Sequence, residues 1–218
     1  HPDVRRMLMT MKANIQAGRA ICYATAVAAD AGDRAVEDLL TPIAKAWGTD
    51  LGVEASSLGV QVHGGMGFIE EGGAAQFYRD ARITPIYEGT NGIQAIDLYG
   101  RKLLGDRGEA MGHFIEEART QGGVFARPAE ALREATDFVL SAPRADALAG
   151  ATAYLSLAGD VIGGLLLSRG LQRAKSAEQK ALFDFYAATV LARAPSRVAE
   201  VKLGAAALTN PALADFAG

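Results

Sequence analysis

The chain is poor in cysteine and histidine, and this shortage excludes two classes of site. It has a single cysteine, Cys22, so an intramolecular disulfide cannot form. Cys22 occupies an apolar position of a helical pattern, where we expect a small core residue. One cysteine and three histidines provide no spacing typical of metal ligands, so no metal site is predicted.

An excess of charge of one sign is also lacking. The 22 Lys and Arg residues nearly balance the 25 Asp and Glu residues, without a basic block, which argues against nucleic-acid binding. No uninterrupted apolar run approaches the ~20 residues of a membrane span, so we expect no membrane insertion. The first residues include no signal-peptide pattern and no initiator Met. The sequence therefore predicts a cytoplasmic protein from a reducing compartment, and a truncated one.

Apolar residues make up half of the chain and recur at helical spacing, which predicts an all-α protein. A first helix is expected over residues 2–29. A second is expected over 34–63, with Pro42 at a kink or at the true start, and with Gly64-Gly65 at its end. The first helix carries a stripe expected to face inward, made of Val4, Leu8, Met11, Ile15, Gly18, Cys22 and Thr25. The small residues at 18, 22 and 25–26 would permit close approach of another helix.

Glycines around residue 105 weaken the helical pattern, so we place a domain boundary there. Residues 1–104 are predicted to form an antiparallel helical bundle, and residues 105–218 a second helical bundle. Short helices over 70–80 and 90–104 should flank an extended stretch at 83–87. The helices expected in the second part are 106–119, 128–142, 145–170, 177–193 and 196–209.

Three short motifs fall within residues 61–94. Gly64, Gly65 and Gly67 permit close backbone approach and positive φ, and such a loop at a helix end can offer amides to a phosphate, although a run of this kind taken alone is more often a helix C-cap. The segment R-D-A-R-I at 79–83 is by itself typical of a surface ion pair. A glutamate such as Glu88, directly before a Gly-Thr helix start, most often complements the helix dipole.

The order and combination of these motifs are more specific than any one of them. Together, Q-V-H-G-G-M-G-F, R-D-A-R-I and I-Y-E-G-T-N-G-I-Q resemble the acyl-CoA dehydrogenase family, flavoenzymes that desaturate acyl-CoA thioesters. The resemblance covers residues 1–104, as the later helices of the family's C-terminal helical domain. The phrase H-P-D-V-R-R-M-L and the helices after 105 resemble longer bacterial members with a C-terminal helical extension.

The resemblance implies a catalytic base. Glu88 would remove the α-proton of the thioester while the β-hydrogen leaves as hydride to flavin N5. Its carboxylate has to be ionised and shielded from water, and its backbone N–H would hydrogen-bond the thioester carbonyl. Tyr87 would line the acyl pocket, with a core role as the alternative, and Gly89 is assigned to substrate binding beside it.

The resemblance also implies FAD as cofactor. Gln61, Gly64 and Gly65 match a loop that reaches the adenosine-pyrophosphate part of the FAD in a neighbouring subunit, and Thr90 matches a position that contacts FAD. Some relatives have Gln where this chain has Gly92, so a side-chain contact is not expected there.

Partners follow from the same resemblance: an acyl-CoA substrate, electron-transfer flavoprotein as electron acceptor, and a homodimer or homotetramer. The family's N-terminal helical domain and middle β-domain are missing, which predicts a C-terminal fragment that is inactive by itself. Three alternatives remain open at this point. They are an acyl-CoA oxidase that passes electrons to O₂, a non-catalytic flavoprotein of the same fold, and an oligomerisation module.

Overall fold

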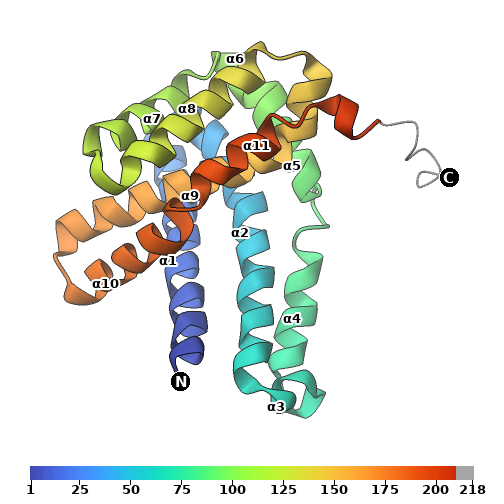
Figure 1. Ribbon diagram of the computed structural model, residues 1–218, viewed down its shortest axis with the longest axis vertical. Coiled ribbons are helices and arrows are strands. Elements are labelled where there is room, and N and C mark those ends of the chain that lie inside the picture. Colours follow the sequence, from blue (N-terminus) through green and yellow to red (C-terminus); the bar gives the residue numbers. More distant parts are fainter. Residues whose placement is uncertain (210–218) are drawn as a thin grey trace.

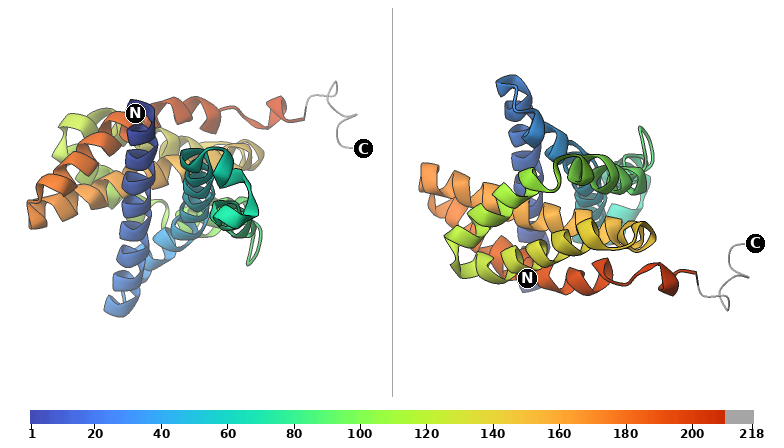
Figure 2. Two further views of the ribbon diagram at one scale, coloured as in Figure 1. Left: turned by 90° about the horizontal axis from the view of Figure 1, so that it is seen from below. Right: turned by 90° about the horizontal axis from the view of Figure 1, so that it is seen from above.

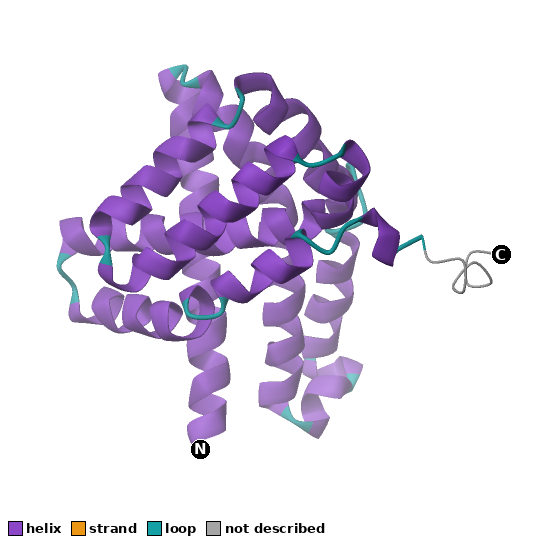
Figure 3. Ribbon diagram, turned by 45° about the horizontal axis from the view of Figure 1, so that its top comes forward, coloured by secondary structure: helices purple, strands orange, loops and turns teal. Residues whose placement is uncertain are grey.

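The computed structural model describes residues 1–209, and all regular elements in this range are helices (Figure 3). The all-α prediction is therefore confirmed. Helices α1 (Pro2–Ala31) and α2 (Arg34–His63) agree with the predicted helices to within two residues. They form an antiparallel hairpin around Gly32, whose φ of 71° suits glycine. Pro42 lies inside α2 rather than at its start.

A narrow arm, made of the end of α2, α3 (Gly65–Phe68), a 3₁₀ turn (Glu70–Gly72) and α4 (Ala74–Ile83), extends from the body of the molecule (Figure 1). Helix α4 returns along α2. The single helix predicted over 70–80 is therefore wrong. Two pieces replace it because Gly73, with a φ of 76°, interrupts the helical path.

The segment that follows α4 is a compact turn, so the predicted extended stretch at 83–87 is also wrong. The N–H groups of Ile86 and Tyr87 both donate to the Ile83 carbonyl, at 2.9 and 3.1 Å, and the Asn91 N–H donates to the Pro85 carbonyl at 3.0 Å. A continuous helical rod follows, somewhat longer than predicted: α5 (Asn91–Asp97), a π-helical segment (Leu98–Leu103) and α6 (Leu104–Asp106).

The second part of the chain forms a layer of crossing helices over the hairpin (Figure 2). Its elements are α7 (Glu109–Gln121), a 3₁₀ turn (Gly123–Phe125), α8 (Ala126–Ser141), α9 (Arg144–Ala174), α10 (Ala177–Tyr186), a π-helical segment (Ala187–Leu191), a 3₁₀ turn (Ala194–Ser196), α11 (Arg197–Val201) and a last 3₁₀ turn (Ala205–Ala207). The predicted helices are present up to α10 and its π-helical continuation.

The last predicted helix, over 196–209, is wrong beyond α11. Gly204 has a φ of 76° and an extended ψ of 159°, which no helix accommodates. The Ala205 N–H donates to the Asp146 carboxylate at 2.7 Å, so the chain is turned toward the start of α9.

Helix α9 is the centre of the core, in contact with α1, α2, α8, α10 and α11. Trp47 of α2 packs against Gly159 and Gly163 of α9, where a side chain would collide with the indole ring. A continuous cluster of buried apolar residues includes members from both sides of residue 105. The division into domains 1–104 and 105–218 stays a prediction, because the two parts share this core.

Within residues 1–209, α9 is the one helix long and apolar enough to cross a membrane, judged by length and composition alone. Its most apolar window is 78% buried by the other helices. That environment is typical of a core helix. Asp160, in the middle of the window, explains why the sequence shows no uninterrupted apolar run.

Part of the predicted inward face of α1 is wrong. Leu8 and Ile15 are 48% and 44% exposed, and Cys22 is exposed as well, contrary to the expected core position. The reason is that α9 and α10 pack on the neighbouring face of α1. The residues buried there are Met7, Ala13, Asn14, Ala17, Ile21 and Ala28.

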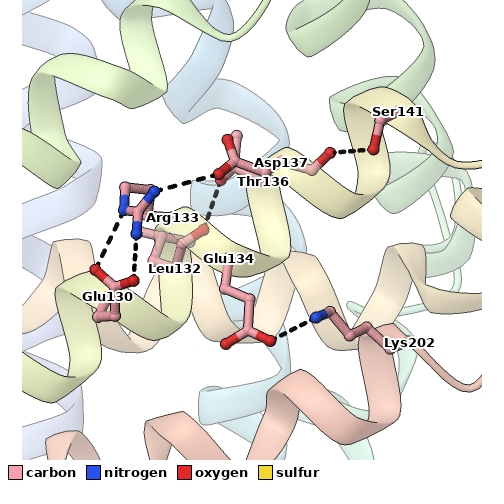
Figure 4. A network of polar contacts seen from close by, with 8 residues as sticks. All are labelled: Glu130, Leu132, Arg133, Glu134, Thr136, Asp137, Ser141 and Lys202. Carbon is pink, nitrogen blue, oxygen red and sulfur yellow. Dashed lines mark hydrogen bonds and ion pairs between the residues drawn. The ribbon is translucent and has the colours of Figure 1, made fainter.

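Polar contacts hold α8 and the end of α11 together at the surface (Figure 4). Arg133 pairs with Glu130 and Asp137 on its own helix, and Lys202 pairs with Glu134. Such exposed pairs contribute little to stability, and among these three the Lys202–Glu134 pair is the one that joins α8 to the end of α11.

Candidate functional site

The turn between α4 and α5 contains Glu88, the predicted base. Glu88 has a φ of 53° and Gly89 a φ of 87°, so two consecutive residues adopt the left-handed conformation. This conformation costs about 1 kcal/mol for a residue with a side chain. A Cβ added at Gly89 would also lie 3.1 Å from the Gln94 amide nitrogen. The turn is thus a defined backbone geometry that presents one carboxylate.

Backbone donors of this turn are free to bind a ligand. The N–H groups of Glu88, Gly89 and Thr90 donate to no acceptor within residues 1–209. All three residues are exposed, and the Glu88 carboxylate forms no ion pair with any residue in that range. Thr90 instead caps α5, because its Oγ1 accepts the Ile93 N–H at 3.3 Å. The shielding from water that the resemblance implies for Glu88 is not provided by this chain alone.

Asn91 ties the turn to α2, and the sequence pattern did not single it out. Its Nδ2 lies 3.0 Å from the Ala46 carbonyl, 3.0 Å from Thr49 Oγ1 and 2.7 Å from Asp50 Oδ1. Its Oδ1 accepts hydrogen bonds from Lys45 Nζ at 2.9 Å and from Thr49 Oγ1 at 3.2 Å. The polar side chains at 45 and 49, one helical turn apart on α2, are the sequence signal for such a contact.

The predicted FAD-loop residues lie at the opposite end of the arm. Gln61 is in the last turn of α2, and Gly64, with a φ of 62°, ends that helix. The Gly65 N–H donates to no described acceptor. A Cβ at Gly64 or Gly65 would meet no atom within 4 Å, so the backbone faces open space. Gly67, in contrast, is required by packing, because a Cβ there would lie 2.3 Å from the Val60 carbonyl oxygen.

Helix α4 separates these two groups of predicted site residues (Figure 1). It has 10 residues, which at 1.5 Å per residue corresponds to about 15 Å. The turn brings together Tyr87, Glu88, Gly89 and Thr90, whereas Gln61, Gly64 and Gly65 lie at the tip. Within this chain the two groups do not line one pocket.

Large apolar side chains along the arm are exposed. Tyr87 is 49% exposed, so the alternative of a core role is wrong for this chain, and its place in an acyl pocket stays a prediction. The neighbouring exposed residues are Met66, Phe68, Phe77, Tyr78, Ile83, Ile86 and Ile93. An apolar surface of this extent is typical of an interaction or ligand surface.

A second polar cluster lies where α2, α9 and α11 meet, beside a cavity of about 370 Å³. Asp160 is 6% exposed. Its carboxylate accepts from Trp47 Nε1 at 3.0 Å and from Arg197 Nε at 2.8 Å. Burial raises the pKa of Asp160, although the Arg197 guanidinium opposes this shift. These contacts connect residues that are far apart in the chain.

Two protein families match almost the whole chain. The family described as "Acyl-CoA dehydrogenase, C-terminal domain" matches residues 1–103, and "Acetyl-CoA dehydrogenase C-terminal like" matches residues 108–211.

Curated relatives agree with these matches. The chain is 44% identical over 191 residues to a 3-methylmercaptopropionyl-CoA dehydrogenase of Ruegeria pomeroyi, which covers 75% of this chain and 32% of that protein. It is 32% identical over 203 residues to the broad-specificity linear acyl-CoA dehydrogenase FadE5 of Mycobacterium tuberculosis, covering 78% of this chain and 33% of that protein. The chain thus spans about a third of the length of these relatives.

Solved structures share the fold. An acyl-CoA dehydrogenase from Bacillus anthracis, complexed with FAD, superimposes with a TM-score of 0.68 at 19% identity, covering 100% of this chain and 44% of that one. Caenorhabditis elegans ACDH-11, in complex with C11-CoA, gives a TM-score of 0.65 at 19% identity, covering 85% and 36%. From the family matches and the curated relatives, the chain belongs to the acyl-CoA dehydrogenase family and corresponds to the C-terminal part of its longer members.

Proposed function

We propose that this chain carries the catalytic base of an FAD-dependent acyl-CoA dehydrogenase, with Glu88 in that role. The observation that carries the proposal is the left-handed turn at Glu88, in which an exposed carboxylate and an unbonded backbone N–H belong to the same residue. A thioester bound against this turn would meet a base and a hydrogen-bond donor at once.

The chemistry follows from these two groups. The Glu88 carboxylate takes the α-proton, and the Glu88 N–H donates to the thioester oxygen as negative charge develops there. A donor placed in this way is worth about 3 kcal/mol in the transition state. Tyr87 and Gly89 would contact the acyl-CoA substrate beside the base, and the exposed side chain of Tyr87 is available for that contact.

The residues at the tip of the arm fit a flavin nucleotide. The open space above Gly64 and Gly65, together with the free Gly65 N–H, allows a pyrophosphate to approach the backbone. Gln61, Gly64 and Gly65 would hold the FAD of a neighbouring subunit, and Thr90 would contact the FAD beside Glu88. The tip and the turn lie at opposite ends of the 10-residue helix α4. When bound, FAD supplies the two-electron acceptor for the desaturation.

The remaining partners follow from this proposal. Electrons would pass to electron-transfer flavoprotein, the assembly would be a homodimer or homotetramer, and the protein would be cytoplasmic. The chain spans about a third of its curated relatives, and Glu88 is exposed. We therefore expect the isolated chain to be colourless and inactive, and flavin binding with bleaching by an acyl-CoA would contradict this.

The test replaces the base in the flavin-loaded protein that contains this chain. Glu88→Gln should keep the flavin spectrum and abolish exchange of the thioester α-proton with D₂O, because the amide cannot accept that proton. Butyryl-CoA and 3-methylmercaptopropionyl-CoA serve as substrates, and exchange is measured by NMR. The matched control is Glu71→Gln, at an exposed position on the tip of the arm, which should exchange at the wild-type rate.

Unchanged exchange in Glu88→Gln would assign the base to another residue. The oxidase alternative is decided in the same preparation. Peroxide formed in air at the rate of desaturation would identify O₂, rather than electron-transfer flavoprotein, as the acceptor.

A further inference from the structure

The Glu88 turn has few contacts of its own to hold it. Two of its residues are left-handed, and its N–H groups at 88, 89 and 90 are unbonded within the described chain. A strained backbone of this kind persists only where the surrounding structure determines it. The anchor has to lie next to the turn and has to be attached to a rigid element.

Asn91 meets both conditions. It is the first residue of α5, three positions after Glu88, and its N–H closes the turn onto the Pro85 carbonyl at 3.0 Å. Its side chain reaches α2, where the contacts to Thr49 and Asp50 are 3.0 and 2.7 Å. Because α2 is a 30-residue helix packed against α1 and α9, it is a rigid reference for the turn.

The orientation of the Asn91 amide is fixed by charge. Lys45 has only donors to offer, so the oxygen of the amide has to face Lys45 Nζ, at 2.9 Å. The NH₂ group then faces the Asp50 carboxylate. A flipped amide would oppose donor to donor and acceptor to acceptor. A lysine on one side and an aspartate on the other thus select one rotamer of Asn91.

We propose that Asn91, held between Lys45 and Asp50, is a positioning residue that keeps the Glu88 turn in its left-handed conformation. This inference rests on the function proposed above for what the turn does, but the anchoring itself is a property of the chain. Asn91 acts through the backbone of the turn and does not touch the reacting atoms.

The first measurement is amide hydrogen exchange in the full chain. Asn91→Ala should accelerate exchange at the bonded amides of Tyr87 and Gln94 about tenfold, since local opening governs their protection. Amides in α9 should be unaffected. The matched control is Asn14→Ala, which truncates a buried asparagine whose side chain bonds to no described residue, whereas Asn91 is half-buried. It should leave the turn unchanged.

A charge swap separates specific anchoring from loss of packing. Asn91→Asp should also accelerate exchange, because two carboxylates would then face each other at positions 50 and 91. The double variant Asp50→Asn with Asn91→Asp restores a donor opposite an acceptor and should return exchange to within about threefold of wild type. A residue that only fills space would give no such rescue.

The functional arm uses the flavin-loaded protein that contains this chain. Asn91→Ala should slow α-proton exchange about tenfold with little change in the KM for the acyl-CoA substrate. The double variant with the charge swap should restore the exchange rate. If the wild type exchanges no thioester α-proton, the proposed function fails while the amide-exchange arm still decides the anchoring. Unchanged turn amides in Asn91→Ala, equal acceleration in α9, or no rescue by the swap would overturn the proposal.

Discussion

Asp160 shows at the scale of one residue why sequence patterns miss long-range polar contacts. It lies in the most apolar part of α9, and its partners Trp47 and Arg197 come from α2 and α11. Nothing in local periodicity relates residues so far apart in the chain. Its backbone carbonyl also accepts from the Tyr186 hydroxyl at 2.9 Å, so four elements meet at this residue.

The raised pKa of Asp160 gives a pH-dependent prediction. Burial places the pKa of Asp160 in the folded protein above its value in the unfolded chain, which is about 4. The contribution of this carboxyl to stability is therefore fully present below the unfolded pKa and is lost as pH rises through the folded pKa. The Asp160→Asn variant lacks this loss. We therefore expect its unfolding free energy, relative to wild type, to increase as pH rises, measured by urea denaturation between about pH 4 and pH 7. A relative stability that is constant or falls with pH would contradict the expectation.

Glu88 illustrates a different limit at the same scale. Its position could be predicted because three motifs occur in a fixed order within 61–94, although each motif alone has a common structural explanation. Its left-handed φ of 53° could not be predicted, because no local preference places a glutamate there. The role of Asn91 was missed for a similar reason, since its partners lie more than 40 residues away on α2.

At the scale of elements, helical periodicity predicted most of the helices and failed where single contacts or glycines set the path. The hairpin of α1 and α2 was predicted closely because two long amphipathic patterns end at Gly32 and Gly64. The helix expected over 196–209 ends early, where Asp146 captures the Ala205 amide. The prediction that the α1 stripe faces inward was partly wrong, because the sequence does not specify which of two adjacent faces a neighbouring helix covers.

The close packing of Trp47 against Gly159 and Gly163 of α9 gives a prediction at this scale. A Cβ at Gly159 would lie 2.4 Å from Trp47 Cγ, so Gly159→Ala should displace the indole and destabilise the protein by about 2–3 kcal/mol. The matched control on the same helix is Gly170→Ala, which meets no atom within 4 Å. It should stabilise by about 0.5–1 kcal/mol through helix propensity.

Urea denaturation of the two glycine variants measures both values, and near-ultraviolet circular dichroism reports the environment of the single tryptophan. Equal effects of the two substitutions would show that Trp47 does not depend on the close approach of α2 and α9.

At the scale of the whole molecule, the contrast is between a well-packed body and an open arm. The helices around α9 share a continuous apolar core, whereas α1 and the arm expose large apolar side chains. Composition could predict the helical body, because burying apolar stripes requires only other helices. The exposed faces could not be predicted, because helical periodicity marks a face as apolar without specifying what packs against it.

The exposed stripe of α1 predicts self-association of the isolated chain. Leu8 and Ile15 lie two helical turns apart, at 48% and 44% exposure, so they can pack against a second copy. Sedimentation at high micromolar concentration should give a mass above the 22.8 kDa of the monomer. The double variant Leu8→Glu with Ile15→Glu should be monomeric with little loss of stability, because both side chains are already exposed. Leu104→Glu, at 44% exposure on another part of the surface, is the matched control and should still associate. A wild-type chain that remains monomeric over this range would remove the stripe as an assembly surface.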